Sequence, residues 1–377
     1  MIVVVSNTRA IKKDIIKSIP IFVRRSYCLN LHWSEKGLVF QNYLTHSSII
    51  SYPLLTHMLG ELSDFKSLDE IKKQFAKKGS SNWDEVLQTL IDHNILVIRD
   101  SDLDKKEKMI EKWKWDHPAR YYHFITKDVE YTFDLQNEKK YFIELAKTEP
   151  MPNHYKEYIL SKVIKLSSNE ETEYLDYNGK LSSLLFKRRT IRNFNRDKNM
   201  SFHQFSRILS YTWGKTSSID KGEIERRIFR TSPSGGCRHP IEVYPIVMRV
   251  EDISRGIYHY SVKNHSLELI EEYDYENEIT NLCSGQPWFK DAAAIFVMTA
   301  ILERSMWRYR NSRTYRIIQM DAAHLAQTFH LVVTSLNLGP LTTAGVKDSL
   351  LEDVLKIDGI NEVLIYLCAV GIPKCLF

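Results

Sequence analysis

Apolar residues recur at strand and helix spacing through the first hundred residues of the chain. Alternating apolar positions are typical of strands, and apolar positions three and four residues apart are typical of helices. The elements predicted on this basis are strands at 22–27, 37–40 and 95–98 and helices at 51–62, 67–77 and 81–93. This order of elements predicts a winged-helix-like module.

The third predicted helix of this module does not suit DNA recognition. It carries Asp84, Glu85 and Asp92 instead of a row of basic side chains. Capture of a peptide suits the module better, because an extended peptide can add to a free strand edge through main-chain hydrogen bonds. We therefore expect no nucleic-acid partner.

A region of different composition follows the module. Residues 100–116 are charged and rich in lysine, and residues 167–179 are acidic and irregular. An aromatic patch begins near the end of the first stretch and consists of Trp113, Trp115, Tyr121, Tyr122 and His123. We expect a module at 1–115, a connecting segment at 116–180 and a second domain at 181–377.

Helices and apolar strands alternate beyond residue 180. The predicted elements are a helix at 201–213, strands at 241–249, 256–260, 293–299 and 362–371, and a long helix at 313–336. Gly339 follows the long helix at a position typical of helix ends. The pattern predicts an α+β domain whose mainly antiparallel sheet is flanked by helices.

Composition indicates a globular protein with two cores. The chain has 377 residues, 43% of them hydrophobic, and a net charge of +5 that is mild for this length. Its five cysteines show no Cys-x-x-Cys spacing, so we expect no disulfide scaffold, no zinc site and no other metal. The apolar start at 1–5 is too short for a signal peptide, and no later run is long enough to span a membrane. We expect a cytoplasmic protein.

Two short segments carry candidate chemistry. Arg188, Arg189 and Arg192 place three cations within five residues, and Thr190 adds a hydroxyl. Guanidinium groups match phosphate oxygens, although a solvated basic helix start is an alternative interpretation. The second segment, Ser-Pro-Ser-Gly-Gly at 232–236, predicts a turn whose backbone can lie against a flat ligand, because glycine has no side chain to hold the ligand away.

With these segments in view, residues 180–374 resemble the nitroreductase-like FMN proteins, and more narrowly the SagB-type, McbC-like dehydrogenases of ribosomal peptide modification. Four stretches carry the resemblance: Lys-Arg-Arg-Thr-Ile-Arg-Asn-Phe at 187–194, the turn and strand at 232–244, the helix at 315–327 and the glycine-containing stretch at 338–373. The resemblance implies a homodimer with FMN at the subunit interface, acting on a precursor peptide.

The resemblance also implies roles for individual residues. Arg188, Arg189, Thr190 and Arg192 would hold the FMN phosphate, with Lys374 as a further cation. The flavin ring would lie along the turn that contains Pro233, Ser234, Gly235 and Gly236. Thr343, Ala344 and Gly345 would supply backbone donors near the ring from the partner side, although Gly345 could equally be an ordinary turn glycine.

Two polar residues of the long helix have a structural interpretation. Asp321 and His324 are three residues apart and therefore share one side of the helix. We interpret His324 as a partly buried structural histidine, hydrogen-bonded by Asp321, and not as a catalytic group.

The proposed chemistry needs a group that moves a proton. Oxidation of a thiazoline or oxazoline to an azole removes a proton from carbon and delivers a hydride to FMN. The related azole-forming enzymes are expected to use a lysine–tyrosine pair, and Arg308–Tyr309 is the corresponding pair here. Arginine does not lose its proton at ordinary pH, so Arg308 can orient a substrate but cannot act as the base.

Other functions remain open from the sequence. Tyr309 could donate a proton in the reverse reaction, in which NAD(P)H-reduced FMN reduces dehydroalanine or dehydrobutyrine in a lanthipeptide. The chain could also be a non-catalytic scaffold in a peptide-modifying complex. A cyclodehydratase would be the partner enzyme in azole formation, and a lanthionine synthetase would be the partner in the reductive reaction.

Overall fold

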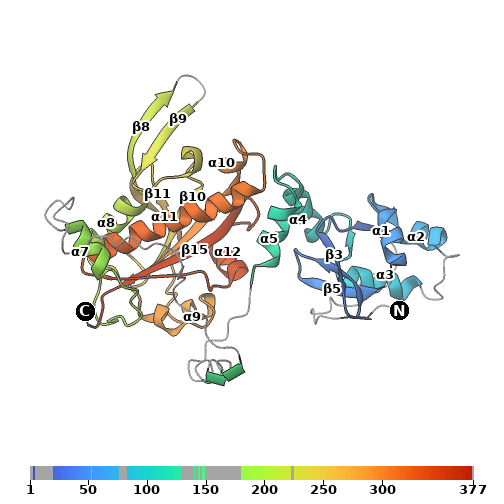
Figure 1. Cartoon of the computed structure of the whole chain (residues 1–377), viewed down its shortest axis with the longest axis horizontal. Coiled ribbons are helices and arrows are strands. Elements are labelled where there is room, and N and C mark those ends of the chain that lie inside the picture. Colours follow the sequence, from blue (N-terminus) through green and yellow to red (C-terminus); the bar gives the residue numbers. More distant parts are fainter. Residues whose placement is uncertain are drawn as a thin grey trace, which may run out of the picture. The chain divides into compact units, whose positions relative to one another are not determined.

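The computed structural model describes residues 3–4, 20–51, 53–75, 83–128, 140, 143–144, 147–148, 180–221 and 225–375. The chain divides into two compact units (Figure 1). The first unit consists of Met1–Lys127, Leu302–Ile317 and Asp358–Glu362. The second unit consists of Asp128–Ile301, Ile318–Ile357 and Val363–Phe377.

Two small sheets and three helices form the start of the first unit. One sheet has the strand order β1 (Val3–Val4), β5 (Ser47–Ser51), β4 (Gly37–Asn42), β3 (Leu29–Ser34), and the other has the order β6 (Lys66–Ser67), β2 (Phe22–Arg25), β7 (Leu96–Ile98). The helices are α1 (Leu54–Gly60), α2 (Leu68–Phe75) and α3 (Trp83–Asp92). Their apolar faces share one buried cluster that contains Phe40, Ile49, Ile71 and Leu90.

The predicted elements of the module are confirmed in their order, but one helix begins later than expected and four strands, β1, β3, β5 and β6, were not predicted. The helix expected at 51–62 begins only at Leu54, because Ser47–Ser51 is strand β5 and pairs with β4. Isoleucines at 49 and 50 favour a strand, and Pro53 then starts the helix, where its missing N–H costs nothing. A further unpredicted strand, β3, pairs with β4 in antiparallel register.

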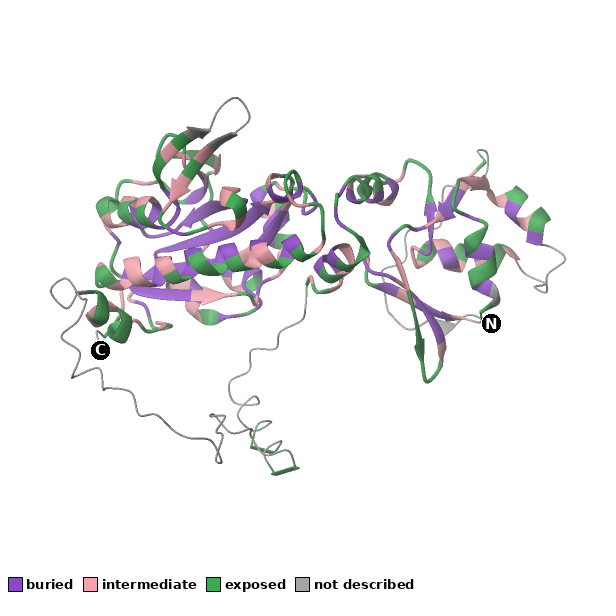
Figure 2. Ribbon diagram, turned by 45° about the horizontal axis from the view of Figure 1, so that its top comes forward, coloured by how far each residue is buried: buried purple, intermediate pink, exposed green. Residues whose placement is uncertain are grey.

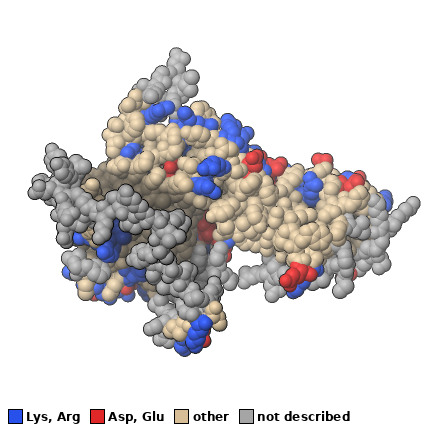
Figure 3. Space-filling view, viewed as in Figure 1, with Lys and Arg blue, Asp and Glu red and all other residues tan. Residues whose placement is uncertain are grey.

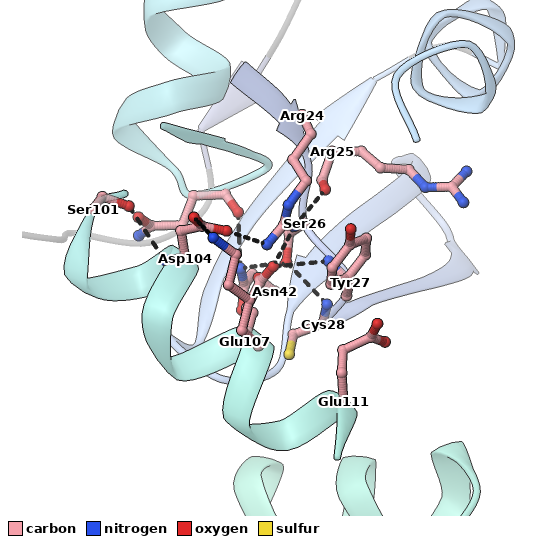
Figure 4. A network of polar contacts seen from close by, with 12 residues as sticks. Arg24, Arg25, Ser26, Tyr27, Cys28, Asn42, Ser101, Asp104, Glu107 and Glu111 are labelled. Atoms are coloured by element: carbon pink, nitrogen blue, oxygen red, sulfur yellow. Dashed lines mark hydrogen bonds and ion pairs between the residues drawn. The ribbon is translucent and has the colours of Figure 1, made fainter. Parts of the chain in front are cut away.

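A buried ionic network joins this module to α4 (Asp102–Glu111) (Figure 4). The guanidinium of Arg24 on β2 lies 2.7 Å from Asp104 Oδ1 and 2.6 Å from Glu107 Oε2, and all three side chains are almost fully buried. Burial would raise the pKa of Asp104, but hydrogen bonds from Lys108, the Asp100 N–H and Arg24 outweigh it and hold that pKa below its usual value. The network therefore depends on the carboxylate form of Asp104.

Replacing Asp104 with alanine is expected to lower the free energy of unfolding by about 3–5 kcal/mol, because it leaves a buried guanidinium short of one counter-ion. Urea unfolding followed by tryptophan fluorescence measures this loss. Asp102→Ala is the matched control, since this acidic residue of the same helix is exposed and should change stability by less than about 0.5 kcal/mol. Because folding depresses the pKa of Asp104, its contribution is present at neutral pH and is lost as the pH falls through the folded-state pKa. An equal loss in both variants would contradict the prediction.

A six-stranded sheet forms the centre of the second unit. Its strand order is β12 (Ser266–Glu271), β11 (Gly256–Ser261), β10 (Ile241–Val247), β13 (Ala294–Ile301), β15 (Glu362–Gly371), β14 (Gly339–Thr343). The pairs β11·β12, β10·β11, β10·β13 and β14·β15 are antiparallel. The mainly antiparallel sheet with flanking helices that the sequence predicted is confirmed.

The strands of this sheet are largely buried (Figure 2), and the neighbours of strand β13 show how helices cover its two faces. On one face, Phe296 stacks with Trp213 of α8 (Phe202–Trp213), their ring centroids 5.2 Å apart, and contacts Phe329 of α11 (Arg313–Ser335). On the other face, the neighbours Ile295 and Val297 join a cluster with residues of α9 (Ile279–Leu282) and α12 (Asp348–Leu355). The alternation of side chains along a strand explains why one strand serves both layers.

The sequence did not predict several elements of this unit, among them a hairpin and an edge strand. Strands β8 (Lys215–Lys221) and β9 (Glu225–Arg230) form an antiparallel hairpin, and β12 adds an edge strand to the sheet. The hairpin sequence mixes lysine, serine and arginine with isolated isoleucines, so it lacks the apolar run by which buried strands are recognised. The exposed side chains of Ile219 and Ile228 agree with a hairpin that contributes little to the core.

Candidate functional site

The arginine segment begins where α7 (Lys180–Lys187) ends and is fixed against two strands of the sheet. The N–H of Ile191 donates to the carbonyl of Pro340 on β14 at 2.9 Å, and the N–H of Asn195 donates to the carbonyl of Ile372 at 2.7 Å. The N–H of Lys374 donates to the carbonyl of Asn193 at 3.1 Å. Lys374, although far away in sequence, therefore lies beside the arginines.

Two glycines permit this close packing. A Cβ atom on Gly339 would lie 2.9 Å from Cβ of Ile191, and one on Gly371 would lie 2.6 Å from the ring of Phe194. Both distances are shorter than side-chain carbon atoms tolerate. Gly339 at the start of β14 and Gly371 at the end of β15 thus allow the arginine segment to pack closely against the sheet. The resemblance alone did not explain these two glycines.

The three arginines differ in their surroundings. Arg189 Nη1 donates to the carbonyls of Phe186 and Arg188, so its guanidinium caps the end of α7. The exposed Arg192 guanidinium lies 5.3 Å from the ring centroid of Trp288. Within the described parts of the chain, no acidic side chain forms an ion pair with any of the three. The arginine segment is therefore a cationic surface that suits an anionic ligand.

Arg188 also acts on a buried histidine. Burial, and then the nearby charge of Arg188, lower the pKa of His330 to about 4. His330 lies on α11, and its Nε2 atom is 3.3 Å from Thr342 Oγ1 on β14. The histidine is therefore neutral at physiological pH and adds no charge to the cationic surface.

The side chain of Gln286 holds the turn at 343–345. The buried Gln286 side chain donates from Nε2 to the carbonyls of Gly345 at 2.6 Å and Cys283 at 3.0 Å, and Gly345 N–H donates to Thr343 Oγ1 at 3.0 Å. Ala344 between them is exposed. Gln286 precedes η3 (Pro287–Asp291), which carries Trp288 next to Arg192. The structure thus brings this turn and the arginine segment together in one chain.

The turn at 232–236 is organised by a single acidic side chain. Asp321 on α11 accepts hydrogen bonds from Ser234 Oγ at 2.6 Å and from the Gly235 N–H at 3.1 Å. Pro233 and Gly236 are exposed, so the turn offers backbone to a ligand. The sequence predicted that His324 is a partly buried structural histidine bonded by Asp321. This prediction is wrong, because the side chain of His324 is exposed.

The two halves of the expected cofactor site lie on different sides of α11. His330, beside the arginine segment, follows Asp321, beside the turn, by nine residues, which is about two and a half helical turns. The two side chains therefore face opposite directions. Within one chain the structure groups the arginines, Lys374 and the 343–345 turn, and it places the 233–236 turn apart from them.

Arg308 and Tyr309 belong to the first compact unit of the chain. They follow α10 (Leu302–Met306), and the N–H of Tyr309 donates to the carbonyl of Ser305 at 2.9 Å. Trp115 Nε1 donates to the carbonyl of Tyr309 at 3.0 Å. Arg308 is exposed and Tyr309 is half-buried. The aromatic patch seen in the sequence therefore anchors the candidate catalytic segment.

A second contact ties the same segment to the patch. His123 Nδ1 forms a hydrogen bond with the hydroxyl of Tyr315, and both side chains are buried between α5 (His117–Ile125) and the start of α11. Burial is the main reason why the pKa of His123 falls to about 3. His123 is therefore a neutral structural hydrogen-bonding group in this unit.

Comparison with known proteins identifies the family. Residues 185–372 match the model of the nitroreductase family, so the chain contains a nitroreductase-family domain. By class it is an FMN-dependent oxidoreductase with the nitroreductase fold. This agrees with the resemblance seen in the sequence.

Individual similar proteins share between 22% and 28% sequence identity with the chain. The chain is 27% identical over 258 residues to the trifolitoxin-processing protein TfxB of Rhizobium leguminosarum bv. trifolii, covering 66% of this chain and 67% of TfxB. It is 28% identical over 116 residues to the trifolitoxin operon protein TfxC of the same organism, covering 31% and 32%. A chain of the Escherichia coli microcin synthetase McbBCD complex, solved with truncated pro-MccB17 bound, superimposes with a TM-score of 0.47 at 22% identity, covering 61% of this chain and 80% of that one.

Two further findings concern the described residues. Their helices include none with the length and apolar character needed to cross a bilayer, and their side chains form no group of three metal-ligating residues. On the face shown in Figure 3, lysines and arginines occur in separate groups with acidic residues between them. Such a face does not present a continuous basic surface.

Proposed function

We propose that the protein uses FMN to dehydrogenate azolines to azoles in a ribosomally made peptide. The observation that carries the FMN part is the arginine segment of a nitroreductase-family domain, held against β14 and β15 without an acidic partner in the described chain. The similarity to a trifolitoxin-processing protein over two thirds of each chain supports the peptide substrate. Bound FMN would supply the acceptor for the hydride.

The cofactor-binding residues divide into two groups in this proposal. Arg188, Arg192 and Lys374 bind the phosphate, and Thr190 adds a hydroxyl donor. Arg189 contributes by capping the helix end that carries them. The turn at 343–345 offers backbone donors from the same chain, and the turn at 233–236 receives the ring.

This division supports a homodimer. Because the arginines and the turn at 233–236 lie on opposite sides of α11, one chain does not present both to a single cofactor. Two copies of the chain would bring the arginine group of one subunit to the ring-binding turn of the other. A monomer in solution that binds FMN with full affinity would contradict this part of the proposal.

Arg308 supports a second candidate reaction, the reduction of a dehydroamino acid. Azoline oxidation needs a base, and an arginine at the position expected for lysine does not provide one. The specific observation that favours the reductive alternative is this exposed arginine beside a tyrosine able to donate a proton. In that reaction NAD(P)H would be the electron donor and a dehydroalanine or dehydrobutyrine peptide would be the substrate.

Product mass distinguishes the two reactions. The FMN-loaded protein is incubated with an azoline peptide in air, where dioxygen reoxidises the flavin, and separately with a dehydroalanine peptide and NADPH. We expect the azoline peptide to lose two hydrogens. A gain of two hydrogens by the dehydroalanine peptide would favour the reductive reaction, and unchanged peptides in both reactions would overturn both.

A further inference from the structure

One buried carboxylate controls the turn at 232–236. Asp321 is 4% exposed, and its two oxygens accept the hydroxyl of Ser234 and the N–H of Gly235. The hydrogen bonds join residues 86 and 87 positions apart in the sequence. This contact connects the turn directly to the middle of α11.

The same contact extends to the far end of the turn. Ser234 Oγ, which donates to Asp321, also accepts from the N–H of His239 at 2.9 Å. Between them the backbone is left-handed at Gly236 (φ 60°) and at the non-glycine residue Cys237 (φ 58°), and His239 has a φ of 45°. Such conformations persist only where the surroundings impose them. Asp321 and Ser234 are among the groups that impose this one, together with the carbonyl of Ile228, which lies 2.8 Å from His239 Nε2.

The charge of Asp321 is poorly compensated. Burial, the largest influence, raises its pKa, while the hydrogen bonds from Ser234 and Gly235 and the nearby His324 act in the opposite direction. No lysine or arginine pairs with Asp321 among the residues that the structure describes. A carboxylate in this position therefore projects its negative charge into the turn with little screening.

We propose that Asp321 is a positioning residue for the flavin ring, which holds the ring-binding turn in shape and places a negative charge behind it. This proposal rests on the proposed function, in which the ring lies along residues 233–236. Hydride transfer would bring two electrons and one proton to the ring and leave it with one negative charge, so a negative charge behind it would weaken the binding of reduced FMN relative to oxidised FMN. The bound reduced cofactor consequently becomes a stronger hydride donor.

The expected size of this effect follows from Coulomb's law. A unit charge roughly 10 Å away in a partly buried site changes an equilibrium by about tenfold. For a two-electron couple, tenfold corresponds to about 30 mV in midpoint potential. Asp321→Asn should therefore raise the ratio of reduced to oxidised FMN affinity about tenfold, because the amide can still accept from Gly235 while the charge is gone.

The test uses full-length protein and two readouts, the affinity for oxidised FMN and the midpoint potential of bound FMN. Ser234→Ala is the matched control, since it removes one hydrogen bond of the same contact and leaves the charge. We expect weaker FMN binding in this control with an unchanged potential, and a more positive potential in Asp321→Asn. If Asp321→Asn does not fold, Asp321→Ser carries the same expectation.

The possible outcomes separate the inference from the function on which it rests. Failure of the unmodified protein to bind FMN would overturn the proposed function. Binding by the unmodified protein, with the same midpoint potential in Asp321→Asn, would overturn only the role of Asp321. Loss of folding in both Asp321 variants, with Ser234→Ala folded, would also overturn that role, because Asp321 would then serve the fold and not the ring.

Discussion

Replacing Arg188 and Arg192 together with alanine is expected to weaken FMN binding about a hundredfold to ten-thousandfold. Each guanidinium can form a charge-assisted hydrogen bond with the phosphate, and such a bond contributes about 1.5–3 kcal/mol. Both side chains are available for this role, because no acidic residue in the described chain pairs with them. Titration of the apoprotein with FMN, followed by flavin fluorescence, measures the loss.

Riboflavin provides a sharper comparison, because it has the same ring without the phosphate. We expect the unmodified protein to prefer FMN strongly over riboflavin and the double variant to bind the two with similar affinity. Lys198→Ala, which removes an exposed cation a few residues further on, is the matched control and should leave the preference unchanged. Retention of the FMN preference by the double variant would place the phosphate elsewhere.

Arg189→Ala separates helix capping from phosphate binding within the same cluster. Its guanidinium already donates to the carbonyls of Phe186 and Arg188, so its removal should weaken FMN binding much less than removal of Arg188 and Arg192. The three arginines look equivalent in the sequence, where each is a cation in one short stretch. Only the structure shows that one of them has intramolecular partners.

The fold was predictable from the sequence where a single local pattern determines an element. Strands β10 and β13 are buried along most of their length, and their apolar runs identified them. The hairpin of β8 and β9 was missed because its residues are mostly polar. The start of α1 was misplaced because residues 47–51 pair with β4 as a strand, and the helix begins only after Pro53.

The candidate site was predictable only in part, and for a related reason. Arg188 and Arg192 form a cluster within the chain, and the turn at 232–236 is continuous, so both were visible. Asp321 and Gln286 were not identified as the residues that hold the two turns. Each acts on a segment more than fifty residues away through hydrogen bonds that no local spacing encodes.

The placement of Tyr309 shows the same limitation at the level of domains. Residues 302–317 lie inside the segment that matches the family, yet they fold with the amino-terminal unit. The contact that explains this joins Trp115 to the carbonyl of Tyr309, 194 residues further on. The expected domain boundary near residue 115 stays a prediction. The compact unit that contains Tyr309 combines the amino-terminal residues with this later segment.

Tyr309→Phe is expected to lower turnover about a hundredfold to ten-thousandfold, the usual contribution of a positioned proton donor or acceptor. FMN affinity should stay the same, because Tyr309 lies outside the arginine segment and both proposed cofactor-binding turns. Trp115 holds the main-chain carbonyl of Tyr309 and not its hydroxyl, so the variant keeps that anchor. Single-turnover rates with the accepted peptide measure the chemical step, and Tyr211→Phe, which removes the hydroxyl of an exposed tyrosine, is the control.

Arg308→Lys then shows which reaction Tyr309 serves. Lysine, unlike arginine, loses its proton in the alkaline range, so the substitution supplies the base that azoline oxidation requires. If oxidation is the natural reaction and this position matches the lysine of related enzymes, Arg308→Lys should raise the rate of azoline oxidation in the alkaline range. In the reductive reaction the added base gives no such increase, while Tyr309→Phe still slows turnover. A Tyr309→Phe variant that releases FMN would instead assign the tyrosine a structural role.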